Sequence, residues 1–158
     1  MFYLSVVSMS KPTNAGIQSS NEEKLINHLM KSGKKSVAKK IYENALKEIK
    51  LSGHMNPSVV VQAAIENASP NTMIKSKRIG GAVYQVPVEV KPAKRFFFAT
   101  KWILDAARSK SGKPMYKKLA EELMAAYASQ GSAVKKKEEA HKMAEANKAF
   151  AYMAKYVN

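Results

Sequence analysis

The chain has 158 residues, long enough for one domain with a hydrophobic core. It carries 27 Lys and Arg residues against 12 Asp and Glu residues, a formal net charge of +15, and it has no cysteine. Self-repulsion at this charge indicates a polyanionic partner, with RNA, DNA and anionic lipid as the candidates. The missing cysteines exclude disulfides, zinc knuckles and thiol nucleophiles.

The start of the chain predicts a short irregular segment and then one helical domain. Residues 1–20 carry a single lysine and are expected to be irregular, and the domain is expected over 21–158. Ser20 and Glu23 resemble a capping box, which opens a helix at about Asn21. The first residues are apolar but lack the basic residues of a secretory or mitochondrial leader, so we expect neither.

Two further helices are predicted before residue 70. The first covers about 34–51, where Val37 and four later residues recur at helical spacing and are expected to be core. The second covers about 57–69, because Asn56 is a good N-cap and Pro57 suits the first helical position. This helix is apolar nearly all round and is expected to sit centrally.

The stretch 74–90 is the exception in a helical chain. Two runs of alternating residues flank Gly80 and Gly81, and a two-residue hairpin turn favours glycine because it needs positive φ. Pro87 cannot donate to a strand ladder, so the second strand is expected to be an edge. The first strand is basic, which suits either a probe for a nucleic-acid groove or a protected edge; its cations are Lys75, Lys77 and Arg78.

Three helices are predicted after the hairpin, over about 92–109, 114–129 and 134–156. The first is the most aromatic segment, and we interpret its rings as core packing rather than base stacking; they are Phe96, Phe97, Phe98 and Trp102. Its beginning extends the basic side of the hairpin through Lys91, Lys94, Arg95 and Lys101. The last helix opens with the lysines 135–137, which oppose the helix dipole unless an anion lies opposite them.

No group of residues has the spacing of a catalytic or metal site. Gly80 and Gly81 do not precede a helix, so they form no phosphate-binding loop. The histidines, His28, His54 and His141, are scattered and lack metal-ligand spacing. We therefore expect no enzyme, no cofactor, no bound metal and no small-molecule substrate.

Three binding functions fit the charge. The protein is either a structural RNA-binding protein, an architectural DNA-binding protein or a membrane-surface protein. The cations are spread over several elements rather than one amphipathic helix, which disfavours the membrane. A DNA-bending hairpin needs a wedge residue at its tip, whereas this tip is Gly80 and Gly81. RNA is therefore the favoured partner, and DNA is the alternative.

Three stretches carry a resemblance to a known family. IKSKRIGGAVYQVPVEVKP resembles the hairpin motif of the small-subunit ribosomal protein seven family, and AVKKKEEAHKMAEANKAFAY resembles the C-terminal motif of the same family. NHLMKSGKKSVAKKIYENAL is similar to its first two helices. The resemblance implies a mainly α fold with six helices and one β-hairpin between helices three and four, in agreement with the order predicted above.

The resemblance implies a structural role in the small ribosomal subunit. Members of the family bind the 3′ major domain of small-subunit rRNA, nucleate assembly of the subunit head and lie beside head and platform proteins. Their hairpin reaches toward the exit-site tRNA and the mRNA exit path, which here implicates Lys77, Arg78, Gly80 and Gly81. The implied rRNA contacts are Lys34, Lys35, Lys75, Lys77, Arg78, Lys91, Lys94, Arg95, Lys135, Lys136, Lys137 and Lys142, with Lys101 added from the basic surface and His141 as a weaker candidate.

The chain also departs from the family pattern. Bacterial members usually carry an arginine-rich arm before the first helix, and residues 1–20 have one lysine. This difference favours a mitochondrial ribosome, with the bacterial cytoplasm or a plastid as alternatives. Lys77 stands where arginine is common, so a bidentate contact is lost there.

Overall fold

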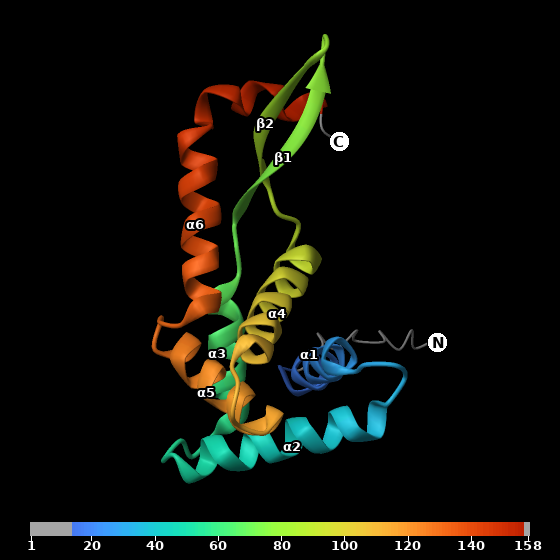
Figure 1. The fold of residues 1–158 in the computed structure, drawn as a ribbon, viewed down its shortest axis with the longest axis vertical. Coiled ribbons are helices and arrows are strands. Elements are labelled where there is room, and N and C mark those ends of the chain that lie inside the picture. The colour runs from blue at the N-terminus through green and yellow to red at the C-terminus, as the bar shows by residue number, and fades with distance from the viewer. Residues whose placement is uncertain (1–13, 157–158) are drawn as a thin grey trace, which may run out of the picture.

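The computed structural model describes residues 14–156, which form seven helical segments and one two-stranded hairpin (Figure 1). In chain order they are α1 Asn14–Leu29, α2 Lys35–Leu51, α3 Pro57–Ala68, β1 Thr72–Ile79, β2 Ala82–Glu89, α4 Pro92–Ser109, α5 Met115–Tyr127, α6 Ser132–Ala146 and the 3₁₀ segment η1 Lys148–Tyr156. The predicted fold class, a mainly α protein with a hairpin between the third and fourth helices, is confirmed.

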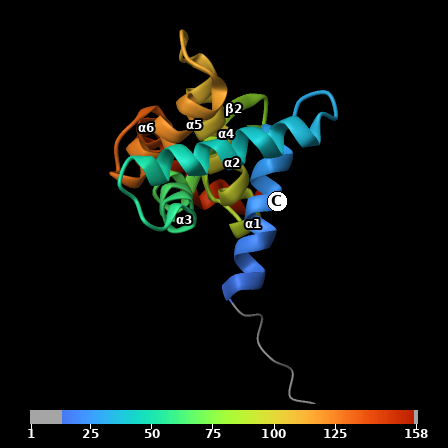
Figure 2. The same cartoon turned by 90° about the horizontal axis from the view of Figure 1, so that it is seen from below.

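The helices pack around α3 and α5, which contact each other, α4 and α6. α2 crosses the lower end of this group, where it packs on α5, α3 and α1 (Figure 2). The hairpin projects from the opposite end (Figure 1). One continuous core fills the helical part, and its fully buried side chains include Leu25, Ile49, Ile103, Leu119 and Leu123.

Helices that begin with proline start where the sequence predicted. α3 starts at Pro57 and α4 at Pro92, because the fixed φ and missing N–H of proline suit the first turn of a helix. The start predicted at Asn21 is wrong, because α1 already begins at Asn14. Serine and asparagine are tolerated inside helices at small cost, so Ser20 lies within the helix instead of capping it. Residues 1–13 of the predicted irregular segment lie outside the described residues.

The predicted core face of α2 is confirmed at Ala45 and Ile49, which are buried, but it is wrong at its start. Val37 was expected to be core, but half of its surface is exposed, whereas its neighbour Ala38 is buried. The buried stripe of α2 consists of Ala38, Tyr42, Ala45 and Ile49. The buried face of α3 could not be predicted to the residue either, because Val59 is exposed and the next two valines are buried. Apolar composition alone does not say which side of a helix meets its neighbours.

The last predicted helix, 134–156, is two elements. α6 ends at Ala146, and Asn147 caps it by donating from Nδ2 to the carbonyl of Met143 over 2.9 Å. The chain then turns into η1, which lies across the hairpin against β2 (Figure 1). The rings of Phe150 and Tyr84 are 5.6 Å apart at this contact. The turn lets the C-terminal segment cover the apolar side of β2, which a straight helix would leave exposed.

The aromatic run of α4 is only partly core. Phe96 and Trp102 are half-buried and pack against the core, and Phe98 is half-buried beside Trp102 at a ring distance of 6.0 Å. Phe97 remains 43% exposed. Successive helical residues are about 100° apart, so three consecutive phenylalanines cannot all face one core. The core interpretation is therefore wrong for Phe97.

A buried carboxylate fixes the start of α6. Glu122 of α5 is 1% exposed, and it accepts a hydrogen bond from the Ala133 N–H over 3.2 Å. Its second oxygen lies 3.1 Å from the Lys110 ammonium. Glu122 thus supplies an acceptor for an N–H in the first turn of α6, and its negative charge favours that end of the helix dipole. The chain passes it closely at Gly131, which has φ 94° and ψ 171°.

We expect Gly131→Ala to lower the free energy of unfolding by about 2 to 3 kcal/mol, because this backbone region is essentially restricted to glycine. An added Cβ would also lie 2.9 Å from Glu122 Oε1 and 3.1 Å from Ala125 Cβ. Urea titration followed by circular dichroism measures the loss. Gly112→Ala is the matched control, since Gly112 has φ 78° but no atom within 4 Å of an added Cβ; it should cost about 1 kcal/mol. Equal losses would contradict an added cost from the backbone region of Gly131 and from its close approach to Glu122.

Candidate nucleic-acid interface

The hairpin carries an exposed group of cations. β1 and β2 pair in register, with Lys75 opposite Val86 and Lys77 opposite Tyr84. Directly opposed side chains share a face of the hairpin. Lys75 and Lys77 therefore lie on the face that α6 and η1 cover, at the edge of the covered area. Arg78 points to the other face. All three cations are exposed, so the hairpin offers positive charge on both sides.

The hairpin tip is a bare glycine turn. Gly80 and Gly81 have φ of 58° and 90°, as the two-residue turn requires, and both are exposed. No atom lies within 4 Å of a Cβ built at either residue. The backbone of another molecule can therefore approach the tip closely, and the tip has no side chain to insert between bases.

The junction from the hairpin into α4 contains both exposed cations and an internal one. Lys91 and Lys94 are exposed. Arg95 is half-buried, and its Nε donates to the Val90 carbonyl over 2.8 Å. Arg95 thereby ties the end of β2 to the first turn of α4. Farther along α4, Lys101 is exposed.

The basic run of α6 likewise contains exposed cations and one that bonds within the protein. Lys135, Lys136 and the later Lys142 are exposed. Lys137 instead donates to the Asn67 carbonyl at the end of α3 over 2.7 Å. One turn later, His141 Nε2 accepts a hydrogen bond from the Asn71 N–H over 2.9 Å. The first bond attaches α6 to the end of α3, and the second attaches it to the residue before β1, at the root of the hairpin.

The remaining predicted residues lie apart from the hairpin. Lys34 and Lys35 are at the start of α2, at the opposite end of the molecule (Figure 1). Lys34 is exposed, and Lys35 pairs with Glu23 at 3.0 Å on the surface. The cations of the hairpin, α4 and α6 therefore extend from the hairpin down the helices beside it, whereas this pair lies at the start of α2 (Figure 1).

Sequence reasoning missed the internal role of Glu122. The residue lies three positions after Leu119 and four before Ala126, both fully buried, so helical spacing places it on the apolar face of α5. A carboxylate on such a stripe indicates a buried partner. The adjacent Glu121, which pairs with Lys110 and Lys113 at the surface, obscured this pattern.

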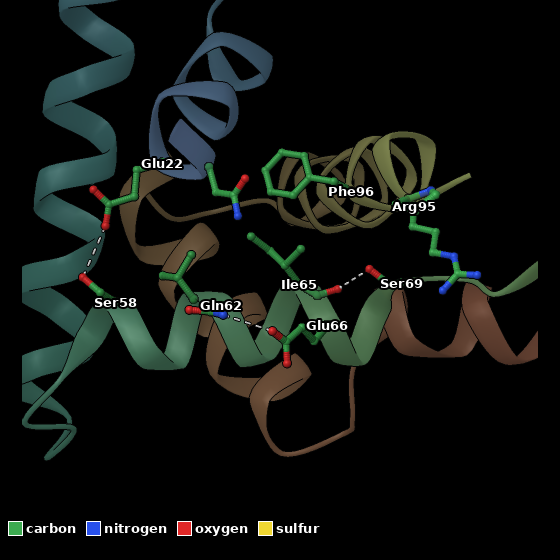
Figure 3. A pocket seen from close by; sticks show the side chains of 11 residues that line it. Glu22, Ser58, Gln62, Ile65, Glu66, Ser69, Arg95 and Phe96 are labelled. Carbon is green, nitrogen blue, oxygen red and sulfur yellow. Dashed lines mark hydrogen bonds between the residues drawn. The ribbon is translucent and has the colours of Figure 1, made fainter. Parts of the chain in front are cut away.

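A cavity of about 200 Å³ lies between α1, α3 and α4 (Figure 3). Glu22 accepts a hydrogen bond from Ser58 on one wall, and Glu66 accepts one from Gln62. Arg95 lies at the far end (Figure 3). Two carboxylates on the walls repel phosphate, so the cavity does not extend the basic surface.

The described residues contain no group of three or more His, Cys, Asp or Glu side chains that could hold a metal ion. Within the same part of the chain, no helix is long and apolar enough to cross a membrane.

The fold and these surfaces define a basic helical domain that carries a cationic hairpin. Residues 7–148 match the sequence model of the family described as Ribosomal protein S7p/S5e. The chain is 50% identical to the small ribosomal subunit protein uS7 of Alkalilimnicola ehrlichii over 129 residues, which covers 82% of this chain and 83% of the relative. It is also 50% identical to the protein of that name from Pseudothermotoga lettingae over 130 residues, covering 82% and 84%.

The chain therefore belongs to the ribosomal protein S7p/S5e family. The family consists of structural proteins, which confirms the prediction that the chain is not an enzyme.

We expect the bond between His141 and Asn71 to make stability depend on pH. Burial and then the nearby Lys137 ammonium lower the pKa of His141 from its ordinary value of 6.5. The unfolded chain thus binds the proton more readily, so stability is complete above about pH 6.5 and falls as acid protonates the acceptor nitrogen. Urea unfolding at pH 8 and pH 5 measures this loss.

His141→Gln keeps an acceptor oxygen but does not titrate, so its loss between pH 8 and pH 5 should be smaller. Some dependence should remain, because burial also lowers the pKa of His28. Identical pH profiles for the two proteins would contradict this role for His141.

Proposed function

We propose that the chain is a structural component of the small ribosomal subunit that binds the 3′ major domain of its rRNA. The family and its uS7 relatives support the ribosomal role. The observation that carries rRNA binding is the set of exposed cations on the hairpin, α4 and α6, in a chain with a net charge of +15. Cations that neutralise phosphates release counterions, which supplies much of the affinity for nucleic acids.

The exposed cations are proposed as phosphate contacts, because their ammonium or guanidinium groups reach solvent. Of the predicted residues, Arg95 and Lys137 act differently. Each donates to a backbone carbonyl, of Val90 and of Asn67, so we propose that its main role is to position the elements around the hairpin. The proposed direct contacts are Lys34, Lys35, Lys75, Lys77, Arg78, Lys91, Lys94, Lys101, Lys135, Lys136 and Lys142.

The hairpin is proposed to reach toward the exit-site tRNA and the mRNA exit path. It is the part of the molecule that projects farthest from the helical core (Figure 1). Lys77 and Arg78 lie just before the turn, so their charges would meet these RNAs first. Gly80 and Gly81 allow a close backbone approach because they carry no side chains.

We further propose that the protein nucleates assembly of the subunit head. The proposed contacts include exposed cations on the hairpin and exposed cations at the start of α2, which lies toward the opposite end of the molecule (Figure 1). A protein that binds RNA at both ends would hold two rRNA segments at a fixed separation. Such an arrangement favours later binding of neighbouring head and platform proteins.

The relatives indicate less about the cellular compartment of this chain than about its fold. The relatives compared are bacterial, among them the uS7 of Methylococcus capsulatus, at 50% identity over 129 residues. This finding fits the bacterial cytoplasm and gives the mitochondrial prediction no support. We therefore propose a bacterial type of ribosome as the assembly that holds the chain.

Binding to a fragment of the head rRNA should weaken steeply as salt increases, with a slope set by the number of phosphates neutralised. Lys77→Ala and Arg78→Ala should each reduce the slope by about 1 and leave the melting temperature unchanged, because both side chains are exposed. Filter binding between 50 and 200 mM salt, roughly the range in which such contacts respond, measures the slope.

Lys39→Ala is the control, because Lys39 is exposed on α2 and lies 4.0 Å from Glu43. This variant should retain the slope of the unmodified chain. Binding that does not respond to salt would overturn the phosphate-contact model, and a large drop in melting temperature would make the hairpin cations structural.

The chain, tagged at its C-terminus and expressed in bacterial cells, should sediment with small ribosomal subunits in a sucrose gradient. An architectural DNA-binding protein would instead sediment with nucleoids and be released by DNase. The same gradient from organelle fractions of the source cells compares mitochondria and plastids. Recovery only in mitochondrial ribosomes would overturn the bacterial proposal.

A further inference from the structure

Phe97 presents an aromatic ring to solvent on the basic side of α4. Its ring is 43% exposed, although the neighbouring Phe96 and Phe98 are half-buried. Exposure of a large aromatic ring inside a well-packed helix carries a hydrophobic cost. Exposure alone assigns no role, because Leu51 and Met55 are more exposed still, so the case for a ligand rests on the groups around this ring.

We propose that Phe97 is a stacking platform for an unpaired base of the RNA that this protein binds, with Lys94 and Lys101 contacting the adjacent phosphates. The inference rests on the proposed rRNA-binding function and adds a base contact to it. Every base has a flat π face, so a single exposed ring accepts an unpaired nucleotide of any sequence.

The charges around the ring suit a nucleotide. Lys94 lies three positions before Phe97 and Lys101 four positions after it, so both share its face of the helix. The Lys101 ammonium lies over the ring, 6.0 Å from its centre, so this long exposed side chain would swing aside to admit a base and stay close enough to bind its phosphate. Residues 92–104 contain three cations and no carboxylate. A stacked base would therefore have a phosphate-binding group on each side.

The ring is held in place by its neighbours. The imidazole of His28 on α1 meets it edge to face at a centroid distance of 5.4 Å. His28 is itself fixed, because Nδ1 lies 2.9 Å from the Thr100 hydroxyl, and that buried hydroxyl donates to the Phe96 carbonyl. A platform that is ordered before binding loses little side-chain entropy when a base stacks on it.

A protein partner fits this surface less well. The exposed residues one helical turn from Phe97 are Ala93, Lys94 and Lys101. Protein interfaces are centred on larger apolar patches, and they are depleted in lysine. One aromatic ring between two lysines is typical of proteins that bind single-stranded nucleic acid.

The test uses the full chain and a fragment of small-subunit head rRNA with 2-aminopurine at its unpaired positions. Stacking quenches the fluorescence of this base. We expect one position to be quenched by the unmodified protein and by Phe97→Tyr, and to stay bright with Phe97→Leu. Phe97→Leu should bind about tenfold more weakly with an unchanged salt slope, because no phosphate contact is lost.

Tyr127→Leu is the matched control. Tyr127 is 42% exposed and meets His54 edge to face at 5.5 Å, but no lysine or arginine occurs in residues 119–134. This variant should bind like the unmodified chain. Lys101→Ala should lower the salt slope by about 1.

The outcomes separate the two proposals. If the unmodified chain binds the fragment and Phe97→Leu binds and quenches equally well, the stacking platform is overturned and rRNA binding stands. If the unmodified chain does not bind, both fail. Phe97→Met replaces Phe97→Leu should the latter lose its thermal unfolding transition, and it is expected to show the same weaker binding.

Discussion

The architecture depends on one buried carboxylate. Glu122 would be costly in the core without partners, and it has two, the Lys110 ammonium and the Ala133 N–H. Together they fix where α6 begins and in which direction it leaves α5. α6 runs beside the hairpin, and η1 then crosses β2 (Figure 1). The position of the basic hairpin thus depends on an ion pair near the other end of α6.

The hairpin needs this support because a two-stranded sheet is at best marginally stable alone. Val86 is fully buried and Tyr84 is half-buried, so β2 has an apolar face that α6 and η1 cover. Two hydrogen bonds hold its root, from Arg95 to the Val90 carbonyl and from the Asn71 N–H to His141, and Lys137 bonds α6 to the end of α3; the family resemblance had suggested all three side chains as RNA contacts. The residues that the motif offers therefore differ in structure, because some are exposed and others bond to the backbone around the hairpin.

The sequence was most informative where backbone chemistry is restrictive. Pro57, Pro92 and the glycine pair at the hairpin tip marked element boundaries, and the fold class followed from them. It was least informative where contacts between residues distant in the sequence determine the local structure. The start of α1 lies before the residue that resembled a cap, and the break at Asn147 lies where the chain turns toward β2, and periodicity reveals neither. Among the site residues, exposure and backbone bonding could not be predicted, since an exposed lysine and an internal one such as Lys137 look alike in a basic run.

Phe97 is another residue whose exposure could not be predicted from the sequence pattern. Its aromatic run predicted a core helix, and only the structure shows that the middle ring stays outside it. Lysine charges draw RNA to a surface but hold it weakly in position, because a solvated ammonium is a mobile point charge. A chain whose cations are mostly lysine gains more from a fixed aromatic contact than an arginine-rich chain would, since arginine already stacks and forms paired hydrogen bonds. An ordered ring between Lys94 and Lys101 adds the orientation that charge alone does not provide.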